Sequence, residues 1–186
     1  VAAALGKTDD CRALMERARN YRNVIDSRTG YAQGRHADGT FLNDDNAFRF
    51  TRFITEGAPC HYTWYVPQDP YGLMKLMGGR ERYAAKLDSM FTEGRYWHGN
   101  EPCHQVAFMF NYAGQPWKTQ QAVRHILDTE YHNTPGGLAG NDDAGQMSAW
   151  YVFAAMGFYP VCPGTPYYML ASPSFPVVTL CSEGGR

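Results

Sequence analysis

The sequence lacks the patterns that identify several common classes of protein. No apolar run approaches about 18 residues, so no transmembrane helix is predicted. Neither G-x-G-x-x-G nor G-x-x-x-x-G-K-[ST] occurs, which argues against nucleotide binding. An excess of charge is also missing, because 17 basic and 18 acidic residues leave a net charge of −1. The balance gives no electrostatic reason to expect nucleic acid or an anionic membrane as a partner.

A zinc site is not predicted either. The chain has five cysteines, an odd number with no C-x-x-C pair: Cys11, Cys60, Cys103, Cys162 and Cys181. The histidines are not spaced as in the H-E-x-x-H or H-x-x-x-H motifs of zinc helices. The N-terminus has no initiating Met and no basic signal-peptide region, so we expect the chain to be an internal piece of a longer protein.

What the sequence does contain is typical of a globular protein with many helices, long loops and aromatic-lined surfaces. Its 186 residues include 13 Tyr, 4 Trp, 19 Gly and 11 Pro, and aromatic surfaces suit sugar rings. Apolar periodicity predicts helices at about 9–25, 70–77, 80–91, 103–113, 116–131 and 143–156. Short strands are expected around 48–54, 167–170 and 177–180. Helix–loop–helix hairpins of this kind can stack into a helical toroid with the polar clusters on its loops.

The most informative stretch runs from 136 to 160. Its glycines give the backbone access to positive φ, and Asp142 and Asp143 follow at the expected start of a helix. Behind them, apolar residues at helical spacing predict a broad buried face. A flexible polar loop supported by a buried helix is a common way to build a pocket. The structural alternative is that the two carboxylates only cap a core helix.

Three loops carry candidate catalytic groups. They hold Glu56, then Glu101 with His98 and Asn100, and finally Asn141, Asp142 and Asp143. Two carboxylates from separate loops are what glycoside hydrolysis requires, one to protonate the leaving oxygen and one to activate water or attack the sugar. The structural alternative makes Glu56 a cap and Glu101 a turn carboxylate before Pro102.

An oxygen-rich set of side chains suggests a hard cation. Asn100, Glu101, Asn141 and Asp142 offer the carboxylate and amide oxygens that Ca²⁺ prefers. No loop has the spacing of an EF-hand, so the pattern alone does not define a calcium site.

These motifs make the chain resemble the C-terminal part of the catalytic domain of a glycoside hydrolase family 92 exo-α-mannosidase. The resemblance rests on G-N-D-D-A-G-Q-M-S-A-W-Y-V-F at 140–153 and G-F-Y-P-V-C-P-G at 157–164. It is supported by G-N-E-P at 99–102, N-Y-A-G at 111–114 and Y-T-W-Y-V-P-Q-D at 62–69. It extends through nearly the whole chain.

The resemblance implies a mainly α fold, part of an (α/α)6 toroid, and calcium-dependent, inverting release of terminal mannose from α-mannosides. It implies Glu56 as general acid, Asp143 as general base and Asp142 as a further catalytic residue. Metal contact is expected from Asn100, Glu101 and Asp142. Substrate contact is expected from Trp64, His98, Glu101, His104 and Asn141. Residues 1–160 would belong to the toroid and 161–186 to a C-terminal β segment.

The partners implied are a mannose-containing glycan and the remainder of the catalytic chain or a β-sandwich domain. The location implied is secreted, periplasmic or cell-surface. One departure from the family pattern concerns the segment after Glu56, which reads G-A-P-C-H where many relatives carry Asn, Trp and Gln. His61 thus replaces an amide. A carbohydrate-binding fragment without turnover and a different toroidal glycosidase or lyase remain alternatives.

Overall fold

The computed structural model describes residues 1–42 and 46–181. The chain divides into two units, Val1–Tyr96 and Trp97–Arg186. Helices dominate both units and the strands are short, which confirms the mainly α fold class. Within the described ranges, no helix combines the length and the apolar character needed to cross a membrane.

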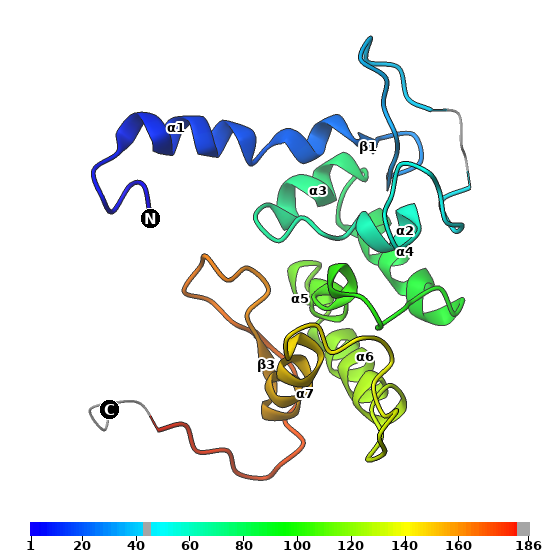
Figure 1. Ribbon diagram of the computed structural model, residues 1–186, viewed down its shortest axis with the longest axis vertical. Helices are drawn as coiled ribbons and strands as arrows, with labels where there is room; N and C mark the ends of the chain where they lie inside the picture. The colour runs from blue at the N-terminus through cyan, green and yellow to red at the C-terminus, as the bar shows by residue number, and fades with distance from the viewer. Residues whose placement is uncertain (43–45, 182–186) are drawn as a thin grey trace. The chain divides into compact units, whose positions relative to one another are not determined.

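The first unit begins with helix α1 (Thr8–Arg17) and the 3-10 turn η1 (Asn20–Asn23), drawn in blue in Figure 1. One continuous helix over 9–25 was therefore a wrong prediction. None of the residues of α1 is buried, so packing does not help the helix to continue. Asn20 and Asn23 are weak helix formers, because their side chains compete for backbone hydrogen bonds.

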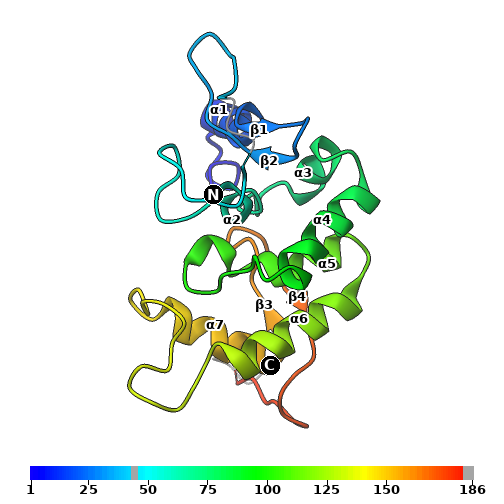
Figure 2. The ribbon, with the colours of Figure 1, turned by 90° about the vertical axis from the view of Figure 1, so that its right-hand side faces the viewer.

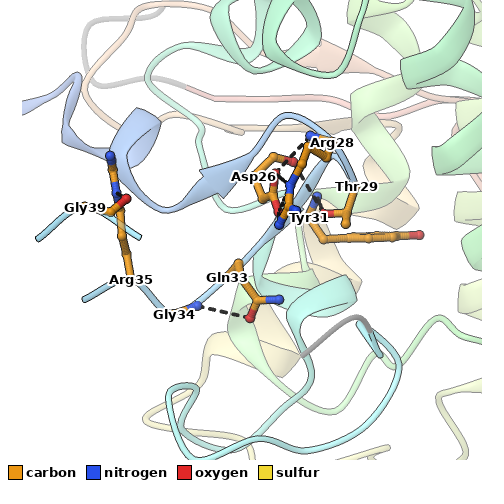
Figure 3. Close-up of polar contacts among 8 residues, drawn as sticks. All are labelled: Asp26, Arg28, Thr29, Tyr31, Gln33, Gly34, Arg35 and Gly39. Atoms are coloured by element: carbon orange, nitrogen blue, oxygen red, sulfur yellow. Dashed lines mark hydrogen bonds and ion pairs between the residues drawn. The ribbon is translucent and has the colours of Figure 1, made fainter. Parts of the chain in front are cut away.

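A small hairpin follows that the sequence did not predict. Strands β1 (Ile25–Asp26) and β2 (Tyr31–Ala32) are antiparallel, with Ile25 opposite Ala32. Asp26 is buried, and its carboxylate accepts hydrogen bonds from the backbone and the guanidinium of Arg28 (Figure 3). This ion pair lowers the pKa of Asp26 and closes the turn between the two strands.

The core of the first unit lies around α2 (Pro59–Tyr62), α3 (Pro70–Leu76) and α4 (Arg80–Thr92). Fully buried side chains fill it: Trp64, Leu73, Tyr83, Leu87 and Met90. The start of α3 was predicted correctly, since the Asp69 carboxylate accepts the Gly72 N–H at 2.9 Å and Pro70 occupies the first turn.

In the second unit, three short turns replace the single helix expected at 103–113. They are η2 (Glu101–Cys103), η3 (Val106–Phe108) and α5 (Met109–Tyr112). Every residue from 103 to 110 is buried, so packing on all sides decides the local winding here. The longer helices predicted at 116–131 and 143–156 do form, as α6 (Pro116–Thr129) and α7 (Gln146–Met156), and they lie side by side (Figure 1).

Strands β3 (Phe158–Tyr159) and β4 (Met169–Leu170) form an antiparallel pair after α7 (Figure 2). The strand expected at 167–170 is thus confirmed only in its second half. Those expected at 48–54 and 177–180 do not form; Val177 and Leu180 remain exposed without pairing. The boundary expected after residue 160 stays a prediction, although the β3–β4 pair joins residues on both sides of it.

Candidate active site

Glu56 lies in the turn before α2 with an unusual backbone. Its φ is +59°, in the left-handed region that residues other than glycine seldom adopt. Its side chain is exposed, while Gly57, Ala58 and the first half of α2 are buried. An exposed carboxyl is therefore carried on a strained turn that is backed by a packed core.

Asp143 has the same backbone feature. Asp143, Ala144 and Gly145 follow one another with φ values of +47°, +58° and +93°. Among the described residues, Glu56, Asp143 and Ala144 make up the non-glycine positions with positive φ. The left-handed run delays α7, whose first residue is Gln146 and not 143 as predicted. Asp143 is exposed, and no hydrogen bond or ion pair to its carboxylate occurs in the described part of the chain.

Asp142 does what the structural alternative expected of it. Its Oδ1 accepts hydrogen bonds from the backbone N–H and the hydroxyl of Ser148, both at 2.9 Å. Its backbone carbonyl accepts the Met147 N–H at 3.2 Å. Asp142 therefore satisfies donors in the first turn of α7 and fixes the loop that presents Asp143.

Two glycines bring the second and third candidate loops together. A β carbon added to Gly140 would lie 2.1 Å from the Gly99 carbonyl oxygen, and one added to Gly99 would lie 2.7 Å from the Ala139 carbonyl oxygen. Only glycine permits backbones to approach this closely. Asn100–Glu101 and Asn141–Asp142 follow these contacts directly, so the oxygen-rich set comes from two adjacent loops.

The donor chemistry of this set is carboxylate and amide. Asn100 Oδ1 accepts the Glu101 N–H at 3.1 Å and caps η2, and both residues are partly exposed. The described residues contain no cluster of three or more His, Cys, Asp or Glu side chains placed to hold a metal ion. Such a set matches Ca²⁺, which combines carboxylates with amide and backbone oxygens, better than it matches zinc.

His98 and His104 lie in the core of the second unit, with 0% and 1% of their surfaces exposed. His98 Nε2 is 2.6 Å from the Tyr131 hydroxyl, which donates to the Met147 carbonyl at 3.1 Å. Since that hydroxyl has one hydrogen, His98 Nε2 is the donor of the pair. Burial and the neighbouring His104 lower the pKa of His98 to about 3.

His104 connects the two loops. Its Nδ1 accepts from the Gln146 side chain at 3.3 Å, so its Nε2 carries the hydrogen that faces the His98 carbonyl at 3.3 Å. The same Nε2 lies 3.1 Å from Met147 Sδ. Burial lowers the pKa of His104 to about 4. A neutral hydrogen-bonded network thus links the start of α7 to the segment before Asn100.

The residues predicted to touch substrate divide into two groups. Glu101 and Asn141 lie on loops with exposed surface, whereas Trp64, His98 and His104 are buried. Trp64 packs edge-on against Tyr83 with ring centroids 5.2 Å apart. The burial of these three favours a supporting role, and substrate contact by them stays a prediction.

Sequence reasoning missed the side chains that support the candidate groups. Tyr131 and Gln146 gave no signal, because their partners are distant in the sequence. His61 and Tyr62 flank the Glu56 turn, and a signal was present: His61 is the third residue of a helix that starts at Pro59, where a side chain can reach back to the N-cap.

A hollow of about 350 Å³ lies beside α7 and contains none of the predicted site residues. Its apolar walls include Tyr131, Leu138, Tyr151 and Val152, and Ser148 lines it as well. None of the candidate carboxylates lines it, although Ser148 also binds Asp142 Oδ1.

Comparison with known proteins places the whole chain in one group. The model of the glycosyl hydrolase family 92 catalytic domain matches residues 1–186. A protein of Arthroderma benhamiae described as an uncharacterized secreted glycosidase is 34% identical over 162 residues, which cover 81% of this chain and 21% of that protein.

Solved structures agree. A family 92 α-mannosidase from Bacteroides thetaiotaomicron matches with a TM-score of 0.86 and 46% identity, over 92% of this chain and 24% of that one. A structure of that mannosidase with mannoimidazole matches with a TM-score of 0.87 and 42% identity, over 92% and 26%. A family 92 inverting mannosidase from Bacteroides thetaiotaomicron VPI-5482 gives 0.84 and 40%, over 92% and 27%.

The chain therefore spans about a quarter of the length of these relatives. The similarity confirms the expected fold class, a mainly helical part of an (α/α)6 toroid.

Proposed function

The chain belongs to glycoside hydrolase family 92, and we propose that the protein containing it releases terminal α-linked mannose from glycans. The reaction would be a calcium-dependent, inverting hydrolysis with Glu56 as general acid and Asp143 as general base. The mannosidase structures matched above support the substrate class, and one of those mannosidases is described as inverting.

The observation that carries the assignment is the shared backbone of Glu56 and Asp143. Each is an exposed carboxylate with positive φ on a turn held by buried residues. A left-handed non-glycine residue costs about 1–2 kcal/mol and persists where the surrounding structure holds it, most often at functional sites. Backbone strain at these two acidic residues supports the proposal that the function depends on where their carboxyl groups lie.

Their roles follow from what hydrolysis requires. The acid must carry a proton to the glycosidic oxygen as the bond breaks. The base must be ionised and reach a water on the opposite face of the sugar ring. Asp143 suits the second role, since its exposed carboxylate is not engaged by a hydrogen bond or ion pair in the described chain.

Asn100, Glu101 and Asp142 are the proposed calcium ligands. Their oxygens come from two loops in contact at Gly99 and Gly140, and Asp142 Oδ2 is left over when Oδ1 binds Ser148. When bound, Ca²⁺ would act as a Lewis acid and a template for sugar hydroxyls. Glu101, a member of this set, and Asn141, the residue before Asp142, are the proposed sugar contacts.

The proposed partners are a mannose-containing glycan and the remaining catalytic chain or a β-sandwich domain. A secreted, periplasmic or cell-surface location is proposed because the Arthroderma benhamiae relative is described as secreted.

Mannose release by the full-length protein tests the proposal. Incubation with an α-linked mannobiose should liberate free mannose, and Asp143→Asn should abolish the release while circular dichroism stays unchanged. Binding of the disaccharide without any release would instead support a carbohydrate-binding role and contradict the proposal.

A further inference from the structure

Two side chains of α2 hold the turn that carries Glu56 from both sides. The Tyr62 hydroxyl donates a hydrogen bond to the carbonyl of Thr55, the residue before Glu56. His61 Nδ1 accepts the backbone N–H of Ala58, two residues after Glu56, at 3.2 Å. The backbone of the left-handed residue is thus bracketed by one short helix.

The ring of His61 is fixed in the form this contact needs. Its Nε2 lies 3.0 Å from the carbonyl oxygen of Arg95, which can only accept, so Nε2 carries the hydrogen. Nδ1 is then the acceptor for Ala58. Burial lowers the pKa of His61 and favours the neutral ring. The side chain therefore ties the turn to the loop that follows α4.

α2 itself is anchored in the core of its unit, beside β2 (Figure 2). The buried Thr63 hydroxyl donates to the Pro59 carbonyl at 2.6 Å and accepts the Ala32 N–H at 2.8 Å. The Cys60 N–H donates to the Ala47 carbonyl at 2.9 Å. Movement of α2 would break these bonds, so His61 and Tyr62 extend from a rigid support.

Gly57 lets the Tyr62 ring lie against the turn. A β carbon at Gly57 would come within 2.6 Å of the ring carbon Cε2 of Tyr62. The turn and the ring therefore fit together only when residue 57 has no side chain.

We propose that His61 and Tyr62 are positioning residues that clamp the Glu56 turn, so that its carboxyl meets the departing oxygen in a fixed geometry. The inference rests on the proposed role of Glu56 as general acid. Positioning of a reacting group contributes to rate because a small displacement of that group is costly in the transition state. The clamp acts on protonation of the leaving group, a step that poor leaving groups need most.

The test compares two substrates in the full-length protein. Tyr62→Phe and His61→Ala should each lower kcat on an α-linked mannobiose by roughly tenfold, a fraction of the ~10²–10⁴ that general acid catalysis contributes. Turnover of an aryl mannoside with an acidic phenol should change little, and KM should stay the same for both. His61→Gln should restore much of the loss, because Gln at this helix position commonly accepts the N-cap N–H.

Two substitutions away from the turn serve as matched controls. Tyr167→Phe and His125→Ala change exposed residues of the other unit and should leave both substrates unaffected. An equal loss on both substrates in Tyr62→Phe, or no loss, would overturn the clamp.

A crystal structure separates this inference from the proposed function. In the His61→Ala/Tyr62→Phe double variant, the backbone of Glu56 should leave its φ of +59° or become disordered. An unchanged turn would overturn the clamp whatever the activity shows. Glu56→Gln, measured in parallel, tests the acid role itself. If this variant loses activity equally on both substrates, the acid assignment fails. The φ of Glu56 in the double variant still decides whether the clamp exists.

Discussion

Gly99 and Gly140 are in direct backbone contact, so close that a β carbon on Gly140 would stand 2.1 Å from the Gly99 carbonyl oxygen. Neither residue has a positive φ, so glycine is needed here for space and not for backbone conformation. The contact places the Asn100–Glu101 loop beside the loop that holds Asp142 and Asp143. The proposed metal and sugar site depends on it.

Gly140→Ala should therefore separate the two loops. Because the clash is with backbone, relief requires a shift of the chain, and overpacking of this kind costs about 1–3 kcal/mol. We expect a lower midpoint of urea unfolding and a loss of mannose release. Gly136→Ala is the matched control, since a β carbon there meets nothing within 4 Å. Equal behaviour of the two variants would show that the contact does not hold the loops.

Asp142→Asn should separate capping from metal binding. The amide oxygen can still accept from Ser148, so thermal stability should change little. Loss of the charge should raise the calcium concentration needed for half-maximal activity, because carboxylates bind Ca²⁺ more strongly than amides.

Excess EDTA should abolish activity of the wild type, with calcium restoring it better than zinc. Full activity after metal loss confirmed by elemental analysis would remove calcium from the mechanism.

The stereochemistry of the product tests the pairing of Glu56 with Asp143. Water must fit between the base and the anomeric carbon, which in inverting enzymes places the two carboxyl groups roughly 6.5–9.5 Å apart. Proton NMR of the first-formed sugar should show β-mannose from an α-mannoside. If α-mannose appears first, the second carboxylate is a nucleophile and the assigned roles are wrong.

Glu56→Gln and Asp143→Asn should differ in their dependence on the leaving group. Loss of the acid should strongly lower kcat for mannobiose. It should change kcat little for an aryl mannoside with an acidic phenol, because that phenol departs without protonation. Loss of the base should reduce both equally, since every substrate needs activated water. Steady-state kcat for the two substrates gives the comparison. Identical profiles would reject the assignment and make Glu101 or Asp142 the next candidate.

The buried histidines should make the stability of the second unit sensitive to acid. His98 and His104 have pKa values of about 3 and about 4 in the folded chain, below the ordinary value of 6.5. The unfolded chain thus takes up protons first as the pH falls. The free energy of unfolding should therefore be highest above pH 6.5. Between pH 6.5 and pH 4 it should decline by about 1.4 kcal/mol per pH unit for each histidine.

Unfolding in urea at pH 7, 6 and 5, followed by tryptophan fluorescence, measures this decline. His104→Gln should flatten the pH dependence, although it lowers stability at pH 7 by about 1–3 kcal/mol through the lost hydrogen bonds. The exposed His125 provides the control: His125→Gln should retain the wild-type slope. Parallel curves for His104→Gln and the wild type would contradict the prediction.

Short-range signals in the sequence determined the helices whose ends depend on neighbouring residues in the chain. Asp69 and Pro70 mark the start of α3, the glycine pair 78–79 separates it from α4, and Gly157 ends α7 with a φ of +91°. The mainly α fold class followed from apolar periodicity. The candidate catalytic carboxylates were also predictable, because each of them belongs to a motif that is contained in a single loop.

Tertiary structure decided everything that depends on distant partners. Residues 103–110 wind as short turns because they are buried on all sides. Strand β2 is held by the Thr63 hydroxyl, which accepts the Ala32 N–H from 31 residues away. The burial of His98 beside Tyr131, and the contact of Gly99 with Gly140, join segments more than 30 residues apart. Local propensity does not encode such contacts. Each of these residues is surrounded by residues that are distant in the sequence and come close only when the chain folds.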